Sequence, residues 1–243
     1  MDSLQKITAV KKSRLNEEIL SQLQQMILNG DFVVGERLPA ERELAQAFGV
    51  NRGTIREAIT KLELLELIEV RHGFGNFVKD FSHSSNLELI NTMLNRGERL
   101  NLKVVKNILA IRKIVVPEMA YLVASCRTQK DLDEMEQIIF QQPTMAIMER
   151  DIAISNIIAR ASGNMLYTVL LNFFTKAGLE VWKLFFDNEK NREDVDRYHR
   201  NLFAAIQKQE SQESRDIVFK GLENAEQYIV SKLEKDEMSS EKQ

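Results

Sequence analysis

The 243-residue sequence has little of several residue types, and each scarcity excludes a class of protein. Cys126 is the only cysteine, so no disulfide can form within the chain. No run of about eighteen or more apolar residues is present, which argues against a membrane-spanning helix. The charged N-terminus lacks the apolar segment of a secretory signal. We therefore expect a cytoplasmic protein with no membrane partner.

Proline and glycine are also scarce, with 3 and 10 residues, while hydrophobic residues make up 44% of the chain. Long stretches without these helix breakers, rich in Leu, Ile, Glu, Lys and Gln, favour helices. The net charge is −3, so the chain lacks the positive charge typical of nucleic-acid-binding proteins. A DNA-binding function must therefore depend on where the basic residues lie.

The motifs of common enzymes are missing too. The sequence has no nucleophile elbow, no phosphate-binding glycine loop and no HExxH zinc motif. Asp151 and His199 are the one pair that resembles catalytic residues, and they lack a third partner. We expect a protein that is not an enzyme.

What the N-terminal part does contain is the pattern of two helices joined by a tight turn, after a first helix at 14–28. The two helices are predicted at 39–49 and 52–66, with Asn51 as the N-cap of the second. The residues of the second helix that face away from its apolar stripe include Arg52, Thr54 and Arg56. This is a helix-turn-helix, in which the second helix reads DNA.

A β-hairpin is predicted directly after these helices. Residues 68–77 are strand-like, and Gly73 and Gly75 allow a tight tip that carries His72. Such a hairpin would form a wing beside the helix-turn-helix. Beyond a short polar linker the pattern is helical almost throughout, with helices expected at about 87–95, 101–125, 128–140, 144–161, 165–186, 191–209 and 211–234.

These elements predict a mainly α-helical protein with a small β wing, built from two domains. Residues 1–79 form the winged helix-turn-helix domain and 80–86 the linker. Residues 87–235 form an all-α bundle that can enclose an effector cavity, and 236–243 are a polar tail.

Several stretches carry a family resemblance. PAERELAQAFGVNRGTIREAI (39–59), followed by RHGFGNFV (71–78), resembles the DNA-binding domain of the GntR family of bacterial transcription regulators. The helical part resembles the FadR subfamily through LAIRKIVVPEMAYLVA (109–124), DIAISNIIARASGN (151–164) and HRNLFAAI (199–206). The resemblance covers about residues 12–232 and implies a repressor or activator that responds to a small-molecule effector.

The resemblance also implies where this chain contacts DNA. The winged domain would bind double-stranded operator DNA as half of a symmetric homodimer, with recognition helices about 34 Å apart. The positions it assigns to DNA are Arg42, Asn51, Arg52, Gly53, Thr54, Arg56, His72 and Gly73. Arginine suits this role because it binds guanine edges and phosphates. The alternative is that these arginines form surface ion pairs with neighbouring glutamates.

Many members of the subfamily hold a divalent metal with one Asp and three His. The matching positions here are Asp151, Ser155, His199 and Gly221, so two of the four ligands are missing. A hydroxyl and a glycine do not replace imidazoles at such a metal, and we expect none. Asp151 and His199 equally fit a structural hydrogen-bonded pair.

The acyl-CoA-responsive members of the subfamily also lack this metal set, and KGLENAEQY (220–228) resembles their C-terminal segment. The resemblance implies an effector site formed by Arg112, Asp151, Ser155, His199, Gly221, Asn224 and Tyr228. Arg112 would bind a carboxylate or phosphate, or else form an ion pair with Asp151 or Glu118. The apolar residues expected to line the cavity are Ile154, Ile158, Leu170, Phe173 and Phe174.

We therefore predict a regulator of fatty-acid or lipid metabolism, with a long-chain acyl-CoA or fatty acid as effector and no other cofactor. The alternative effector is a small carboxylate metabolite. A remoter alternative is an acyl-CoA-binding protein or an enzyme that does not bind DNA, but it leaves the winged segment unexplained.

Overall fold

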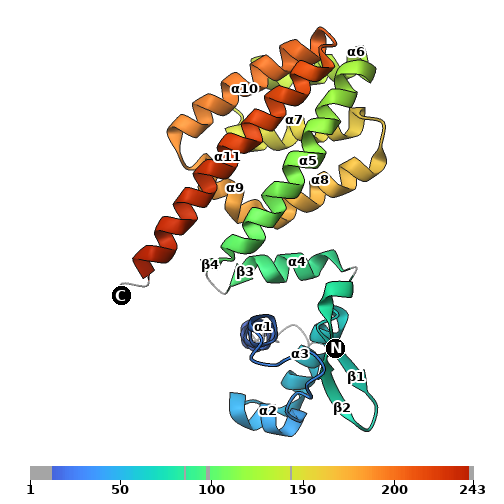
Figure 1. Ribbon diagram of the computed structural model, residues 1–243, viewed down its shortest axis with the longest axis vertical. Coiled ribbons are helices and arrows are strands. Elements are labelled where there is room, and N and C mark those ends of the chain that lie inside the picture. Colours follow the sequence, from blue (N-terminus) through green and yellow to red (C-terminus); the bar gives the residue numbers. More distant parts are fainter. Residues whose placement is uncertain (1–12, 85, 97–98, 143, 241–243) are drawn as a thin grey trace, which may run out of the picture. The chain divides into compact units, whose positions relative to one another are not determined.

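The computed structural model describes residues 13–84, 86–96, 99–142 and 144–240, and most of them are helical (Figure 1). The chain divides into two compact units, one ending at Arg99 and the other beginning at Leu100. Within the described ranges, no helix is both long and apolar enough to cross a membrane.

The first unit contains the predicted helix-turn-helix and wing. Its elements are α1 (Ser13–Asn29), α2 (Glu41–Phe48), α3 (Arg52–Leu64), β1 (Ile68–Arg71), β2 (Gly75–Val78), the short 3₁₀-helix η2 (Phe81–His83) and α4 (Leu87–Leu94). Its core includes Leu23 of α1, Ile55 of α3 and Leu89 of α4, all buried. The apolar faces of these amphipathic helices therefore pack together in one common core.

The turn between α2 and α3 is fixed by local hydrogen bonds. Gly49 ends α2 in the left-handed conformation, at φ +67°, which favours glycine. The Asn51 side chain then accepts a hydrogen bond from the Thr54 amide at 3.0 Å, as an N-cap does. The predicted helix-turn-helix is confirmed.

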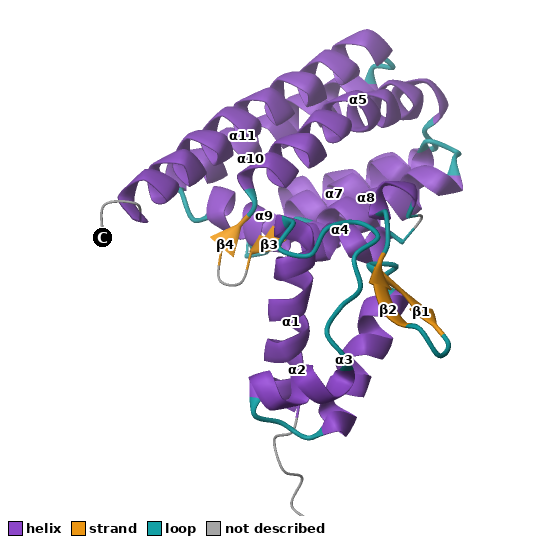
Figure 2. Ribbon diagram, turned by 60° about the horizontal axis from the view of Figure 1, so that its bottom comes forward, coloured by secondary structure: helices purple, strands orange, loops and turns teal. Residues whose placement is uncertain are grey.

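The wing is a two-stranded antiparallel hairpin, coloured orange in Figure 2, that packs beside α3. Ile68 pairs with Val78 at its base and Arg71 with Gly75 near its tip. Gly73 and Gly75 both have positive φ, +81° and +115°, which explains why the tip needs glycine.

The second unit consists of helices, and a pair of very short strands precedes its first helix. Two-residue strands β3 (Asn95–Arg96) and β4 (Arg99–Leu100) pair before it. Its helices are α5 (Leu102–Cys126), α6 (Gln129–Glu136), the π-helix η3 (Gln137–Gln141), α7 (Ile147–Ala161), α8 (Met165–Ala177), α9 (Leu179–Phe186), α10 (Glu189–Gln207) and α11 (Ser211–Ser240). The long helices α5 and α11 lie side by side (Figure 1), and the buried core includes Met119, Ile154 and Leu202.

Four details differ from the sequence prediction. The single helix expected at 165–186 is broken at Gly178, where the Trp182 indole packs so closely that an added Cβ would lie 2.7 Å from its nitrogen. The predicted 128–140 helix ends in a π-helix, and α11 continues to Ser240, beyond residue 234 where it was expected to end. The β3–β4 pair was not predicted, because strands of two residues carry no periodic pattern.

Candidate nucleic-acid interface and effector pocket

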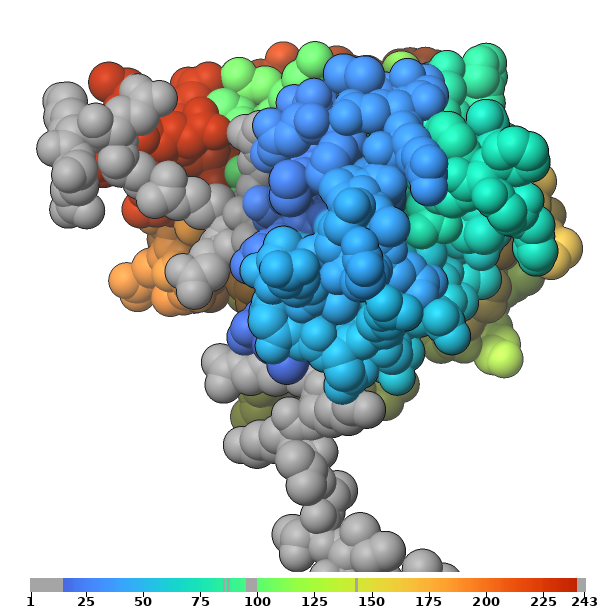
Figure 3. Space-filling model, turned by 90° about the horizontal axis from the view of Figure 1, so that it is seen from below, coloured from blue at the N-terminus to red at the C-terminus, as the bar shows by residue number. Residues whose placement is uncertain are grey.

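The residues predicted to contact DNA lie on α2, on α3, in the turn between them and at the tip of the wing. Figure 3 shows the surface of these segments in blue to green. Arg42 on α2 and Arg52 at the start of α3 are exposed. Neither forms an ion pair with any residue that the structure describes. Their guanidinium groups are therefore available to phosphates or base edges.

Asn51 and Thr54 instead hold the start of α3. The Asn51 Oδ1 atom accepts from the Thr54 amide at 3.0 Å and from the Thr54 hydroxyl at 3.3 Å. Thr54 is buried, at 2% exposure, so its side chain offers DNA no surface in this arrangement. The two residues present Arg52 and Gly53, which are exposed, at the N-terminus of the recognition helix.

Arg56 is the one predicted DNA contact that forms the alternative ion pair. Its guanidinium bonds the Glu41 carboxylate of α2, with an Nη2–Oε2 distance of 2.9 Å. This hydrogen bond raises the pKa of Arg56. The pair links α2 to α3 while leaving most of the Arg56 side chain exposed.

Two arginines at the wing were not among the predicted DNA contacts: Arg71 of β1, which pairs with Glu69 at 3.1 Å, and Arg37, which lies before α2 and reaches the hairpin. His72 and Gly73 are exposed at the tip, as predicted. Arg71 lies 4.3 Å above the Phe77 ring, and Arg37 packs so closely on Gly75 that an added Cβ would lie 2.7 Å from its Nε. The packing of an arginine against an aromatic ring or a glycine follows no regular spacing in the sequence, so these contacts could not be predicted.

The second unit contains a cavity of about 120 Å³ between α5, α7, α9, α10 and α11. Five of the seven predicted effector residues line it, namely Arg112, Asp151, Ser155, Gly221 and Asn224. His199 lies behind Asp151 and is fully buried, and Tyr228 packs edge-on against Phe185 outside the lining. The structure therefore brings five of the predicted residues together at one cavity. The aromatic wall of that cavity, formed by Trp182, Phe185, Phe186 and Tyr198, was not predicted from the sequence.

Arg112 is the unusual group of this pocket. It is buried, and its Nε and Nη1 atoms have no hydrogen-bond partner. The guanidinium lies 4.3 Å from the centre of the Trp182 ring. Neither alternative ion pair forms, because Asp151 bonds His199 and Glu118 pairs with Arg215.

Burial lowers the pKa of Arg112 to about 10, and the negative charge of Asp151 opposes this shift. The side chain is still charged at neutral pH, so a buried positive charge faces the cavity without a direct counter-ion. Such a group costs free energy unless a ligand pairs with it.

The polar side of the pocket beside Arg112 includes Asp151 and Tyr198, with the buried His199 behind Asp151. His199 Nε2 lies 3.0 Å from Asp151 Oδ1, which confirms the structural pair that the sequence suggested. The His199 Nδ1 atom is buried without a partner. Burial, reinforced by Asp151, raises the pKa of the Tyr198 hydroxyl, which therefore stays protonated and can donate a hydrogen bond.

The metal positions of the subfamily do not come together as a metal site. No three His, Cys, Asp or Glu side chains gather around one point anywhere in the described part of the chain. At Gly221, an added Cβ would lie 3.0 Å from the Tyr198 ring, so Tyr198 occupies the space that a longer residue 221 needs. One carboxylate and one imidazole do not fit a tightly bound divalent metal.

The apolar residues expected to line the cavity pack elsewhere. Ile154 and Ile158 belong to the main core, and Phe174 is buried below Arg112, at 5.8 Å from its guanidinium carbon. None of the five expected residues lines the pocket. Helical spacing marks a residue as inward-facing, but it does not separate core from cavity wall.

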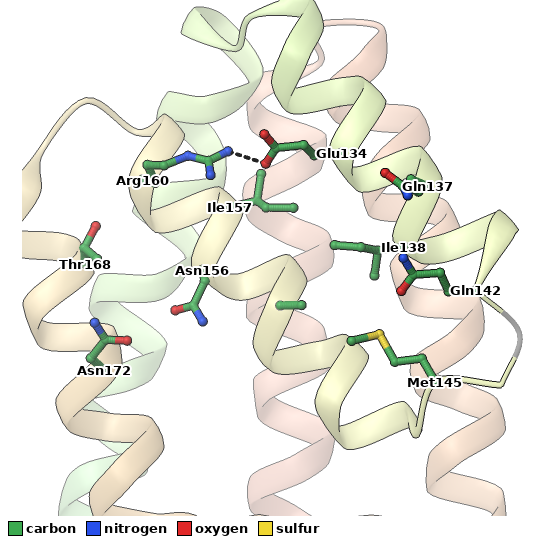
Figure 4. A pocket seen from close by; sticks show the side chains of 11 residues that line it. Glu134, Gln137, Ile138, Gln142, Met145, Asn156, Ile157, Arg160, Thr168 and Asn172 are labelled. Carbon is green, nitrogen blue, oxygen red and sulfur yellow. Dashed lines mark hydrogen bonds and ion pairs between the residues drawn. The ribbon is translucent and has the colours of Figure 1, made fainter.

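A second hollow, a groove of about 640 Å³, lies between α6, η3, α7 and α8 (Figure 4). Its polar lining includes Gln137, Asn156 and Asn172. Its arginine, Arg160, is already paired with Glu134 at 2.7 Å. The groove therefore offers an anion no free charge, unlike the Arg112 pocket.

Comparison with known families decides what kind of protein this is. Residues 15–78 match the model of "Bacterial regulatory proteins, gntR family", and residues 79–239 match "FadR C-terminal domain". The chain belongs to the GntR family. It combines a gntR-family region with a FadR C-terminal domain, as the sequence resemblance predicted.

The relatives of this regulator carry different names. The HTH-type transcriptional regulator Mce2R of Mycobacterium tuberculosis is 37% identical, over 53% of each chain. A fatty acid metabolism regulator protein of Edwardsiella ictaluri is 29% identical, over 68% of this chain and 70% of the relative. The Uxu operon transcriptional regulator of Escherichia coli is 25% identical, over 92% of this chain and 90% of the relative.

Solved structures agree on the fold. The structure of Lar, described as controlling expression of the Listeria monocytogenes agr system, superposes with a TM-score of 0.54 at 14% identity. The similarity covers 91% of this chain and 98% of Lar. It supports the winged helix-turn-helix followed by a helical domain.

Proposed function

We propose that this regulator binds operator DNA as a homodimer and that a small organic carboxylate in the Arg112 pocket changes its DNA affinity. The observation that carries the proposal is the buried, unpaired guanidinium of Arg112 facing a cavity. A carboxylate would supply the missing acceptor and neutralise the charge.

The size of the cavity favours a small ligand. Sites for drug-sized ligands measure about 300–1,000 Å³, whereas this cavity measures about 120 Å³. Tyr198 and Asn224 on its wall can bind hydroxyl or carbonyl groups of a compact metabolite. The alternative effector of the sequence prediction thus fits the geometry better than the first choice.

A long-chain acyl group is the second candidate. Relatives named as fatty acid metabolism regulators support it, as does the apolar wall that includes Trp182, Phe185 and Leu222. A chain of that length requires the cavity to widen, and the aromatic side chains between α9 and α11 are the groups that would have to move.

For DNA we propose direct contacts from Arg42, Arg52 and Arg56, and from His72 and Gly73 at the wing tip. The exposed guanidinium groups of α2 and α3 support this assignment. Asn51 and Thr54 would act by holding the start of α3, where Gly53 lets the backbone approach a phosphate.

Selection from a random-sequence DNA duplex pool tests the DNA part of the proposal. The wild type should enrich a two-fold symmetric motif with half-sites about 10 bp apart. Arg52→Ala should lose the motif, whereas Arg197→Ala, an exposed arginine of the second unit, should keep it. Enrichment of no motif by the wild type would contradict the proposal.

Thermal unfolding with a series of carboxylates tests the effector part. The series consists of acetate, succinate, hexanoate, hexadecanoate and oleoyl-CoA, and binding to the native state raises the melting temperature. We expect a concentration-dependent rise for a short member with the wild type and none with Arg112→Met. A rise in melting temperature for the long-chain members alone would favour the second candidate. Equal rises in the wild type and in Arg112→Met would exclude Arg112 as the residue that binds the carboxylate.

A further inference from the structure

The Arg112 pocket is lined by negative charge as well as by the arginine. Its charged lining residues are Arg112 of α5, Asp151 of α7 and Asp194 of α10. Asp194 pairs with Arg197 and is the more exposed of the two carboxylates. Arg112 and Asp151 also line together a smaller hollow of about 10 Å³. The guanidinium and the Asp151 carboxylate therefore face the same space.

Arg112 and Asp151 do not neutralise each other by direct contact. Burial lowers the pKa of Arg112 and the negative charge of Asp151 opposes that shift, so the two groups interact through space. In the described structure no ion pair joins them, and Asp151 accepts a hydrogen bond from His199 at 3.0 Å. The Asp151 side chain is still 28% exposed and lines the pocket. It is therefore open to a second donor, supplied by a ligand.

This arrangement limits what kind of carboxylate can bind. In a cavity of about 120 Å³, a carboxylate bound to Arg112 would lie close to the Asp151 carboxylate. Like charges repel each other strongly where water is largely excluded. An ammonium group on the same ligand would remove the repulsion and form a charge-assisted hydrogen bond with Asp151. An α-amino acid has both groups on one carbon atom, so it can reach Arg112 and Asp151 at once.

The rest of the wall suits a short apolar side chain. Trp182, Phe185 and Phe186 of α9 line one part of the pocket, and Val218 and Leu222 of α11 line another. Aromatic faces also attract an ammonium group. A dry protein cavity of about 150 Å³ holds a molecule of benzene. The smaller cavity here therefore favours an amino acid in the size range from alanine to valine.

We infer that the effector is a short α-amino acid with an apolar side chain, whose carboxylate binds Arg112 and whose ammonium group binds Asp151. The inference rests on the proposed function, because it requires a carboxylate at Arg112. It goes further in making Asp151 the residue that selects the class of ligand. A carboxylate of similar size without an ammonium group leaves the repulsion from Asp151 in place and binds more weakly.

Isothermal titration calorimetry of the full-length chain with four related probes tests this selection. The probes are L-2-aminobutyrate, butyrate, which lacks the ammonium group, propylamine, which lacks the carboxylate, and L-2-hydroxybutyrate, in which a hydroxyl replaces the ammonium group. The wild type should bind L-2-aminobutyrate at least about tenfold more tightly than each of the other three, since each lacks one charged contact.

Asp151→Asn removes the negative charge and keeps an oxygen atom that can accept the hydrogen bond from His199. It should weaken L-2-aminobutyrate binding about tenfold and leave butyrate binding equal to or tighter than in the wild type. The matched control is Asp133→Asn, the same change at an exposed residue of α6 that does not line the pocket. This control should keep the wild-type order of affinities.

Circular dichroism shows whether each variant is folded, and the order of the four probes in the wild type decides alone if Asp151→Asn unfolds. Equally tight binding of butyrate or L-2-hydroxybutyrate, lost in Arg112→Met, would overturn the inference and leave the proposed function standing. An order of affinities that Asp151→Asn does not change would overturn it too. Equally tight binding of propylamine would contradict both. If none of the four binds, the inference is wrong, and the thermal unfolding series with carboxylates decides separately on the proposed function.

Discussion

Two buried arginines in the helical unit have different surroundings, although the Nε atom of each has no hydrogen-bond partner. Arg150 of α7 bonds the Asp196 carboxylate at 2.6 Å and the Gln142 carbonyl at 3.3 Å. Arg112 of α5 is equally buried, but two of its nitrogen atoms have no partner and it faces a cavity. An arginine that stabilises the fold is expected to be paired within the protein, as Arg150 is. An arginine that binds a ligand is expected to lack such a partner in the ligand-free protein, as Arg112 does.

This contrast predicts opposite effects on stability. Arg112→Met removes an unpaired buried charge and should raise the free energy of unfolding of the ligand-free protein by about 1–2 kcal/mol. Arg150→Met leaves Asp196 without its partner and should lower the free energy of unfolding by about 2–3 kcal/mol. Urea unfolding at pH 7 measures both, and a loss of stability in Arg112→Met would mean that Arg112 serves structure.

The stability gained in Arg112→Met should depend on pH. Burial lowers the pKa of Arg112 to about 10 in the folded protein, below its ordinary value in the unfolded chain. Below pH 10 the charge is present in both states, so its burial destabilises the fold fully. Above pH 10 the folded state loses the proton first, and the wild type regains stability as the pH rises.

We therefore expect the difference in unfolding free energy between Arg112→Met and the wild type to be constant from pH 7 to pH 9. It should shrink above pH 10. Urea titrations of both proteins measure it, and the lysines common to both proteins cancel in the difference. A difference that grows with pH would show that the charged form is stabilised in the fold.

At the scale of elements, the break between α8 and α9 connects packing to the pocket. The Trp182 indole lies against Gly178, and the same indole stacks on Arg112. Gly178→Ala introduces a Cβ 2.7 Å from the Trp182 nitrogen and 3.0 Å from the Phe174 carbonyl oxygen. We expect it to cost about 1–3 kcal/mol of stability and to displace Trp182.

Tryptophan fluorescence measures that displacement, because Trp182 is the only tryptophan in the chain. Gly163→Ala is the control, since its added Cβ meets open space while the positive φ of Gly163, +78°, still strains the backbone. If Gly178→Ala lowers stability but leaves the fluorescence spectrum unchanged, the helix break at Gly178 does not determine the position of Trp182 in the pocket.

The sequence predicted most elements because local rules and the tertiary core agree. Asn51, Gly73 and the apolar stripe of α3 each indicate the structure that forms. The π-helix and the break at Gly178 were missed because they depend on contacts with other helices. At the site, the family resemblance located Arg112 and Asp151, but the aromatic wall around Trp182 became visible only in three dimensions.

At the scale of the whole molecule, the proposal assigns DNA binding to the first unit and effector binding to the second. In the first unit, Arg42 of α2 and Arg52 at the start of α3 are exposed and form no ion pair with the described residues. The second unit holds the buried charge of Arg112, which has no direct counter-ion. A ligand couples the two only if it binds the DNA-competent and DNA-incompetent states with different affinities.

The affinity for the selected DNA duplex, with and without the carboxylate that raises the melting temperature most, tests this coupling most directly. In the wild type, saturating ligand should change the dissociation constant by about 5–150-fold, the usual range of allosteric coupling. In Arg112→Met, the same ligand concentration should leave DNA affinity unchanged. An unchanged affinity in the wild type, or an equal change in both proteins, would contradict control through Arg112.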